Sequence, residues 1–188
     1  MPDYILMKTL HPLKMRSVAV VLAVALGMSA GWSAAEDAAA SRGLSSEDDA
    51  FIRQAGESQL AGQELGSIGK KKAASPVVKS LAATLAKDYI QGTVELWKIA
   101  ASKDAAFPPS PGFIQKIKID FLHTRSNGPS FDKAFVHDVL EEQENDLAYY
   151  EKASRGLRDL DLKAFATRTI PVLKKHIKMA RNAAASVK

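Results

Sequence analysis

The chain has 188 residues, of which 46% are hydrophobic and 7% aromatic, and its formal net charge is +5. This length corresponds to one domain or two, and the composition is that of a globular protein. The chain contains no cysteine, which excludes a disulfide framework, a thiolate zinc site, an iron–sulfur cluster and a cysteine nucleophile.

Residues 1–35 have the features of a secretory signal peptide. Basic residues precede an apolar run at 18–28, and small residues follow this run up to the expected cleavage site. A membrane-spanning helix needs about 20 apolar residues, which is more than this run offers. We therefore predict cleavage before Glu36 and export to the periplasm, with association with the outer membrane as a further expectation. A retained membrane anchor is the alternative.

Removal of residues 1–35 changes the charge only slightly. The mature chain keeps 23 basic and 20 acidic residues, a net charge of +3. A charge this mild does not indicate a nucleic-acid partner. Met15 is an alternative start to Met1, because residues 1–14 add nothing that a signal peptide needs.

After a flexible lead-in at 36–45, the pattern predicts two long helices. The first, over 46–72, starts at the hydroxyl pair Ser45-Ser46, carries acidic residues in its first turn and ends on three lysines. A serine followed by a proline starts the second, over 76–103. Apolar residues recur in both at steps of three and four. Because about three residues separate the two helices, they must run antiparallel.

A long connection follows the second helix. Prolines and a glycine break the helical pattern at 106–112, and a second break lies at 126–129. Between the breaks, residues 113–123 have a mixed apolar pattern that is compatible with a short helix. The whole connection, from 104 to 129, is far longer than the one between the first two helices.

Two further long helices are predicted over 130–154 and 160–184, joined by a short turn. Ser130 is expected to cap the first of them. Pro171 lies inside the second and has no N–H for the carbonyl four residues earlier, so we expect a kink there.

The lengths of the connections predict the fold class. Two antiparallel hairpins joined by one long crossover are typical of a ferritin-like four-helix bundle. The sequence shows no competing strand pattern. It therefore predicts an all-α, ferritin-like four-helix bundle over 46–184.

Several segments, in their order and spacing, resemble a known family. They are Phe51-Ile52-Arg53-Gln54-Ala55, Glu64-Leu65-Gly66, Asp88 with Leu96, Phe131-Asp132-Lys133-Ala134-Phe135-Val136, and Ile170-Pro171-Val172-Leu173-Lys174-Lys175-His176. The chain resembles a bacterial envelope family that is classed as a domain of unknown function and often labelled predicted outer membrane protein. This resemblance implies a ferritin-like helical fold and a place in the cell envelope.

The chain departs from this family at a set of histidines. Family members commonly carry an Asp-His pair in the second and in the third long helix, where this chain has Asp88-Tyr89 and Glu142-Gln143. Of these histidines only His176 remains. If the family's histidines bind metal, the resemblance implies that two of three nitrogen ligands are lost. We expect Tyr89 and Gln143 to face each other or the centre of the core, where a hydroxyl and an amide can satisfy one another as a polar plug.

A cofactor is not predicted. A di-iron carboxylate site needs Glu-x-x-His on two helices, and this spacing does not occur in the chain. A residual divalent-metal site is the alternative to a solvated acidic edge, and its candidate ligands are Glu57, Glu64, Asp88, Glu142 and His176. No constellation of catalytic residues is recognisable, so we predict that the protein is not an enzyme.

Glycines and lysines suggest contact surfaces. Four glycines in the first helix indicate the close approach of another helix, with self-association as the alternative to a neighbour in the same bundle; they are Gly56, Gly62, Gly66 and Gly69. The lysine clusters 70–72 and 174–175 are either solvated or in contact with anionic lipid or cell-wall polymers.

Together these features predict a non-enzymatic exported protein with a binding, structural or stress-related role in the cell envelope. Its expected partner is an envelope protein or a cell-surface polymer. The alternative is a ferritin-like metal-binding or redox protein with a reduced ligand set, a reading that rests on analogy of fold.

Overall fold

The computed structural model describes residues 43–187, and within this range the protein is helical throughout, without a β-strand. Its helices are α2 (Ser46–Lys72), α3 (Pro76–Ser102), α4 (Phe113–Thr124), α5 (Pro129–Gly156) and α6 (Leu160–Ser186). The all-α prediction is therefore confirmed for this part of the chain. The predicted signal peptide and most of the lead-in lie outside the described residues.

Local signals account for the ends of the helices. Ser45 caps α2, because its hydroxyl accepts the N–H of Asp48 at 3.1 Å and the Asp48 carboxylate accepts the N–H of Ser45 at 3.1 Å. The predicted cap of α5 was wrong: Gly128 is the N-cap, and Ser130 lies inside the first turn. Proline at position 129 suits the first helical position, and the φ of 118° before it favours glycine.

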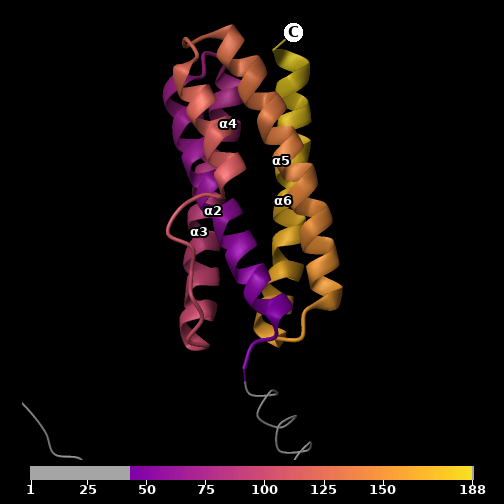
Figure 1. Cartoon of the computed structure of the whole chain (residues 1–188). Coiled ribbons are helices and arrows are strands. Elements are labelled where there is room, and N and C mark those ends of the chain that lie inside the picture. Colours follow the sequence, from indigo (N-terminus) through magenta and orange to yellow (C-terminus); the bar gives the residue numbers. More distant parts are fainter. Residues whose placement is uncertain (1–42, 188) are drawn as a thin grey trace, which may run out of the picture.

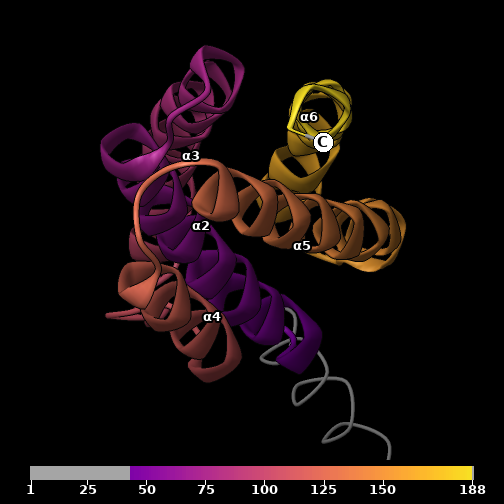
Figure 2. The ribbon, with the colours of Figure 1, turned by 90° about the horizontal axis from the view of Figure 1, so that it is seen from above.

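The four long helices form two hairpins, as Figures 1 and 2 show. Helix α2 packs along α3, and α5 packs along α6; the hairpins then meet through α3 with α6 and α2 with α5. The predicted apolar stripe of α2 is buried at every position, from Phe51 to Ile68. Helix α6 continues through Pro171, where the expected kink stays a prediction.

Helix α4 confirms that the middle connection contains a short helix. It packs on both α2 and α5, and its inner residues Ile119 and Leu122 are fully buried. The ammonium group of Lys72 holds its C-terminal end, since it donates to the carbonyls of His123 (2.7 Å) and Leu122 (3.3 Å). In Figure 1, α4 lies over the upper half of the molecule, alongside α2.

The positions of the helix ends in the first hairpin recur in the second hairpin at a constant separation in sequence. We call this separation the hairpin offset, and it equals the separation between Asp48 and Asp132. The ends of the helices show the repeat. The equivalent pairs are the C-caps Ala73 and Leu157, the N-caps Ser75 and Asp159, and the helix ends Lys72 and Gly156, Pro76 and Leu160, and Ser102 and Ser186. Every pair has this same separation, so both hairpins are built to one pattern. Identical residues at the hairpin offset are few, and they include Asp48 with Asp132 and Gln59 with Gln143.

The repeat has a consequence for packing, because each hairpin fastens the turn of the other. Asp48, 1% exposed, accepts the backbone N–H groups of Arg158 (3.1 Å) and Asp159 (3.3 Å) in the α5–α6 turn. Asp132, 2% exposed, accepts those of Ala74 (3.0 Å) and Ser75 (2.8 Å) in the α2–α3 turn. The two aspartates and the two turns they hold are equivalent at the hairpin offset.

Three of the four glycines predicted to allow a close approach draw α2 and α3 together, whereas Gly56 packs against Pro108 in the connection after α3. A Cβ added at Gly66 would lie 2.7 Å from the Cα of Ala86 on α3, and one at Gly62 would overlap the ring of Tyr89. Gly69 faces Ala82 of α3 as well. These glycines are therefore used inside the hairpin. The equivalent residues of the second hairpin are Asp146, Tyr150 and Ala153.

Candidate functional site

A chain of hydrogen-bonded polar side chains crosses the centre of the molecule. All four long helices contribute to it: Ser58 from α2, Asp88 and Tyr89 from α3, Gln143 and Asp146 from α5, and Lys175 and His176 from α6. Ser58, Tyr89, Gln143, Asp146 and His176 are each at most 6% exposed. Buried polar groups are stable only when they are hydrogen-bonded, so this chain is an organised feature of the core.

The inner part of the chain is centred on Asp146 and Gln143. Asp146 accepts hydrogen bonds from the hydroxyls of Ser58 (3.0 Å) and Tyr89 (3.4 Å). The amide of Gln143 connects the Tyr89 hydroxyl, 2.6 Å from Nε2, with Nδ1 of His176, 2.9 Å from Oε1. The predicted contact between Tyr89 and Gln143 is thereby confirmed.

The outer part of the chain reaches solvent at Asp88. Its Oδ2 lies 3.0 Å from Nε2 of His176 and 2.9 Å from Nζ of Lys175. Burial alone would raise the pKa of Asp88, but the hydrogen bonds from Lys175 and His176 outweigh it and lower that pKa. Burial lowers the pKa of His176, against the opposing effect of Asp88. The imidazole is therefore neutral at neutral pH and donates from Nε2 to an ionised carboxylate.

Asp146 is the member of the polar chain whose pKa is shifted into the neutral range. Burial, with a further contribution from the negative charge of Glu142, raises its pKa to about 7, although Ser58 and Tyr89 both donate to it. Burial also raises the pKa of Tyr89 well above its ordinary value. Near neutral pH the inner end of the chain therefore exchanges a proton, while the tyrosine stays neutral.

The row of polar side chains from His176 to Asp146 has two self-consistent hydrogen-bond patterns. In the first, the Gln143 amide nitrogen donates to Tyr89, which donates to ionised Asp146, and a doubly protonated His176 donates to the amide oxygen. In the second, the Gln143 amide is rotated by half a turn, so that its nitrogen donates to Nδ1 of a neutral His176 and its oxygen accepts from the Tyr89 hydroxyl. The hydroxyl oxygen of Tyr89 then accepts from a protonated Asp146. The lowered pKa of His176 favours the second pattern, whereas a pKa of about 7 leaves both forms of Asp146 populated near neutral pH.

The predicted metal ligands do not converge. Only Asp88 and His176 meet; Glu57 lies 3.9 Å from Arg53, and Glu142 accepts from Gln115 at 3.2 Å. Glu64, on α2, is near Lys116 of α4. Within residues 43–187, no group of three His, Asp or Glu side chains is placed to hold a metal ion.

A polar pocket of about 300 Å³ opens beside this chain, between α3 and α6. Asp88, Tyr89 and His176 line one part of it, and Gln59 and Gly92 line another. Gln59 is 3% exposed and donates from Nε2 to the Tyr150 hydroxyl at 3.2 Å. Its Oε1 has no hydrogen-bond partner among the described residues. This oxygen is buried against Gly92 of α3, so the glycine gives the Gln59 amide the space that it occupies.

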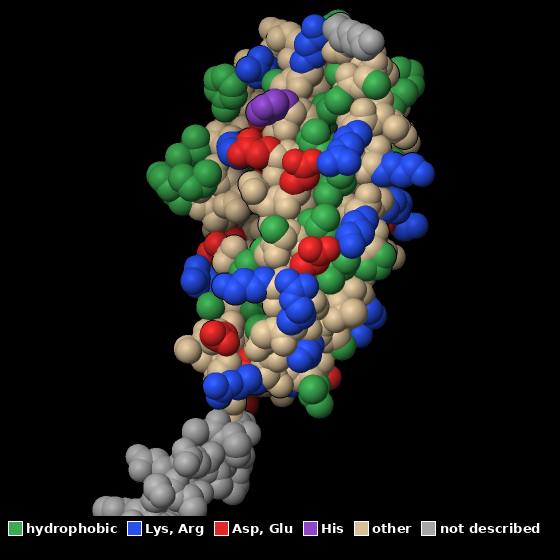
Figure 3. Space-filling view, turned by 90° about the vertical axis from the view of Figure 1, so that its right-hand side faces the viewer, with side chains coloured by type: hydrophobic (Ala, Val, Ile, Leu, Met, Phe, Trp, Pro, Cys, Tyr) green, Lys and Arg blue, Asp and Glu red, His purple; other side chains and the backbone are tan. Residues whose placement is uncertain are grey.

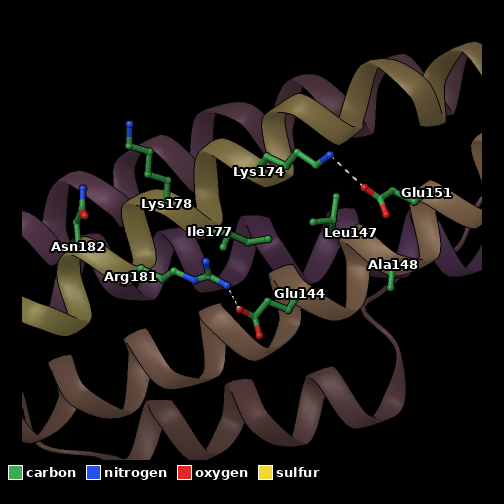
Figure 4. A pocket seen from close by; sticks show the side chains of 9 residues that line it. All are labelled: Glu144, Leu147, Ala148, Glu151, Lys174, Ile177, Lys178, Arg181 and Asn182. Carbon is green, nitrogen blue, oxygen red and sulfur yellow. Dashed lines mark hydrogen bonds and ion pairs between the residues drawn. The ribbon is translucent and has the colours of Figure 1, made fainter.

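A second hollow, about 530 Å³, lies between α5 and α6 on the face shown in Figure 3. Figure 4 shows ion pairs across it, Lys174 with Glu151 (3.1 Å) and Arg181 with Glu144 (2.8 Å), while Lys178 points away. Lys, Arg, Asp and Glu side chains are mixed over this face in Figure 3. Such pairing is typical of a solvated surface, so we do not place a site here.

The outer face of α4 is unusually apolar. Phe113, Ile114, Ile117 and Phe121 are 79%, 61%, 51% and 56% exposed. Their spacing places them on the side of the helix opposite Ile119 and Leu122, which face the core. More large apolar side chains of α4 therefore face solvent than face the protein. Contiguous exposed apolar surface of this kind marks a contact site.

The sequence pattern of one protein family, described as Domain of unknown function (DUF4142), matches residues 33–183. The chain belongs to this family. The match includes all of the polar chain, the α3–α6 pocket and α4. No curated protein and no solved structure matches the chain.

Sequence reasoning missed two central residues of this DUF4142 protein. Asp146 was not singled out, although it lies three residues after Gln143 and four before Tyr150, on the buried stripe of α5. Gln59 likewise follows the buried Ser58 directly. A polar residue in register with an apolar stripe was the available signal in each case.

Proposed function

We propose that this protein is a non-enzymatic, exported component of the cell envelope that binds the membrane surface through α4. The observation that carries the proposal is the solvent-facing apolar stripe of α4. From the sequence, a membrane contact was expected at the lysine clusters, and the proposal places this contact on α4. Lys174 and Lys175 pair with Glu151 and Asp88, and Lys72 holds the end of α4.

Charge around the stripe favours an anionic lipid surface. Lys116, which pairs with Asp120, lies on one flank of the stripe, and Lys118, which pairs with Glu141, lies on the other. Arg125 is on the same side as Lys118, with its guanidinium 4.7 Å from the ring centre of Phe121. Asp120 is the one acidic residue in α4. Lysine and arginine beside a row of phenylalanine and isoleucine is the arrangement of helices that lie in the headgroup region.

The size of the stripe argues against a stable dimer. Helix α4 has 12 residues and is therefore about 18 Å long. Stable protein interfaces bury about 800 Å² on each partner, which is more than one side of so short a helix presents. A lipid surface needs only a few inserted side chains, so the stripe suits lipid better than a second copy of the chain.

Vesicle binding tests the proposal. We expect the purified protein to sediment with vesicles of phosphatidylethanolamine and anionic phosphatidylglycerol, mixed roughly two to one, and less so at high salt. The triple variant Phe113→Ser, Ile117→Ser, Phe121→Ser should bind at least ~10-fold more weakly, because each buried side chain contributes about 1.5–3 kcal/mol. The matched control removes three exposed apolar residues of α3, in Ile90→Ser, Val94→Ser, Trp97→Ser. Equal binding by both triple variants would refute the assignment to α4.

Export and the finer fold belong to the same proposal. The family match begins at residue 33, so the predicted signal peptide lies almost wholly outside the family's domain. We infer a ferritin-like four-helix bundle, with α4 inside the crossover between the hairpins. N-terminal sequencing of the chain from the periplasm should return a start at Glu36; retention of residues 1–35 there would contradict cleavage.

The structure of the polar chain supports a non-enzymatic role. Both ring nitrogens of His176 take part in hydrogen bonds within the protein, so neither has a free lone pair for a substrate or a metal. The neighbours of the imidazole are likewise engaged within the protein: Asp88 with Lys175, Gln143 with Tyr89, and Tyr89 with Asp146.

Metal or redox function is the second candidate, favoured by the contact of His176 with Asp88 across α3 and α6. Elemental analysis of the untagged protein after challenge with iron, manganese, zinc and copper decides between the two. We expect less than one tenth of an equivalent of each metal after dialysis. Stoichiometric metal that is lost in His176→Ala would establish the second candidate.

A further inference from the structure

One end of the molecule carries a group of lysines from three helices. The last turn of α2, the first turn of α3 and the start of α5 meet there, because Asp132 of α5 binds the backbone of the α2–α3 turn. Helix α4 ends beside them, since Lys72 of α2 donates to its last carbonyls. We call this the basic end; in Figure 1 it is the upper end, and its exposed lysines are Lys70, Lys71, Lys79 and Lys133.

These four lysines have no acidic partner within residues 43–187. Ion pairs form in other parts of this range, but none of them includes a lysine of the basic end. The one acidic residue in the three helix segments is Asp132, which is 2% exposed and already accepts two backbone N–H groups. The basic end therefore presents positive charge that no exposed carboxylate of these segments neutralises.

Two of the lysines lie where they disfavour the fold. Lys79 is the fourth residue of α3 and Lys133 the fifth of α5. Both are near the positive end of a helix dipole, where a cation is unfavourable. Neither helix has a side-chain cap at its start, whereas α2 and α6, which begin at the opposite end, are capped by Ser45 and Asp159. A departure from the rules of helix stability is typical of a surface that has another use.

The membrane contact proposed for α4 has little unpaired charge of its own. Lys116 and Lys118, which flank the apolar stripe, are both paired with carboxylates. The basic end adjoins the stripe, because the guanidinium of Arg125, the C-cap of α4, lies 4.7 Å from the ring centre of Phe121. Unpaired positive charge and exposed apolar side chains thus occur side by side.

We propose that the basic end binds the phosphate groups of anionic phospholipids while α4 inserts its apolar side chains, and that it makes the contact selective for anionic membranes. The inference rests on the proposed function of α4. Each lysine close to an anionic lipid surface strengthens binding about five-fold. A soluble polyanion would need charge alone, whereas a membrane offers charged headgroups beside an apolar interior. The two adjoining surfaces of the protein match this arrangement.

The proposal fixes the orientation of the molecule on the membrane. The α2–α3 turn belongs to the basic end, and the α5–α6 turn lies at the opposite end of the bundle (Figure 1). The chain has no cysteine, so a single introduced cysteine can be labelled with an environment-sensitive fluorophore. The emission of a label on Ala74→Cys should shift to the blue when vesicles are added, and that of a label on Gly156→Cys should not. Equal shifts at the two exposed positions would overturn the placement of the basic end at the membrane.

Exchange of the four lysines tests the selectivity. The variant should bind the vesicles of phosphatidylethanolamine and phosphatidylglycerol at least ~10-fold more weakly than the native protein. It should bind neutral phosphatidylcholine vesicles as well as the native protein does, because α4 is unchanged. The substitutions are Lys70→Gln, Lys71→Gln, Lys79→Gln and Lys133→Gln.

A matched control removes the same net charge from other surfaces. It should bind the anionic vesicles within ~3-fold of the native protein, because charges more than about 8 Å away are screened at physiological salt. Circular dichroism melting confirms that both variants are folded. The control substitutions, at exposed lysines without an ion pair among the described residues, are Lys87→Gln, Lys98→Gln, Lys152→Gln and Lys178→Gln.

Other results would overturn the proposal. Equal losses in the two quadruple variants would mean that net charge acts, whatever its position. Equal losses on anionic and neutral vesicles would mean that the four lysines do not select the lipid. Normal vesicle binding with loss of binding to inorganic polyphosphate would assign the basic end to a soluble polyanion. The triple variant of α4 should lose binding to both kinds of vesicle, so a failure of α4 and a failure of the basic end give different results.

Discussion

The two hairpins share one plan at their ends and differ at their centres. Asp48 and Asp132 fasten the opposite turns through equivalent backbone N–H groups. At the centre, α2 presents glycine to α3, whereas α5 places Asp146 and Tyr150 at the equivalent positions. The ends therefore hold the fold, and the centres have been free to acquire different packing and chemistry.

The largest expected effect concerns Asp146, which has glycine as its equivalent in the first hairpin. Its pKa of about 7 in the folded chain is above the ordinary value of 3.8, so the folded state binds more protons between these values. Its contribution to stability is therefore greatest below pH 4 and is lost as pH rises toward 7. At 1.36 kcal/mol for each pKa unit, the loss is about 4 kcal/mol. Glu142, which raises this pKa, faces Asp146 within the same helix.

Asp146→Asn measures this loss. The free energy of unfolding of the variant, minus that of the native protein, should rise from pH 4 to pH 7 and then level off. Taking the difference removes the contribution of His176, whose lowered pKa makes stability fall as pH drops below 6.5. Urea titrations at each pH provide both values. A difference that does not change with pH would show that Asp146 is ionised at no cost.

The next effect comes from the close packing of α2 on α3. Gly66→Ala places a methyl group 2.7 Å from the Cα of Ala86, and a backbone atom cannot rotate away as a side chain can. We expect a loss of about 3 kcal/mol in the free energy of unfolding, despite the better helix propensity of alanine. The control is Gly156→Ala at the end of α5, where an added Cβ meets nothing within 4 Å. That variant should be neutral or slightly more stable.

Sequence reasoning recovered most of the fold because helix ends depend on local signals. The end of α2 at Lys72 and the starts of α3 and α6 were predicted correctly, since caps, proline and apolar period all lie within a few residues. The cap of α5 was wrong, although its start was predicted within one residue, because Gly128-Pro129 and Ser130 both offer a start. Local patterns of this kind are short and do not depend on the tertiary fold.

The candidate site was recovered only in part, since its contacts are distant in sequence. The facing of Tyr89 and Gln143 followed from two buried stripes. The residual candidate ligands do not lie together, because Glu57 and Glu64 are on the side of α2 near α4, away from His176. From the sequence, Asp48 was one of the acidic residues that favour the start of α2, yet its carboxylate also accepts a backbone N–H from the α5–α6 turn. Such contacts depend on how two helices are aligned along their lengths, and the sequence pattern of a single helix does not determine this alignment.

The shared ends of the hairpins allow a matched pair of substitutions. Asp48→Ala and Asp132→Ala each leave two N–H groups of the opposite turn without an acceptor. We expect the lost turn contacts to cost about 2 kcal/mol in each variant at neutral pH, with about 1 kcal/mol more in Asp48→Ala, because Asp48 also forms the capping box with Ser45. Urea unfolding provides the comparison. If one variant lost several times more than the other, the two ends would not be equivalent in energy.

The smallest expected effect concerns Pro171 in α6, whose equivalent in α3 is Lys87. The proline leaves the carbonyl of Thr167 without its helical donor, while the lysine of α3 has an ordinary N–H. Pro171→Ala restores that donor at an exposed position, so we expect a gain of about 1 kcal/mol in the free energy of unfolding. Lys87→Ala, the matched change in α3, should alter stability by less than ~0.5 kcal/mol. A loss in Pro171→Ala would mean that α6 needs a bend at this position to follow α3.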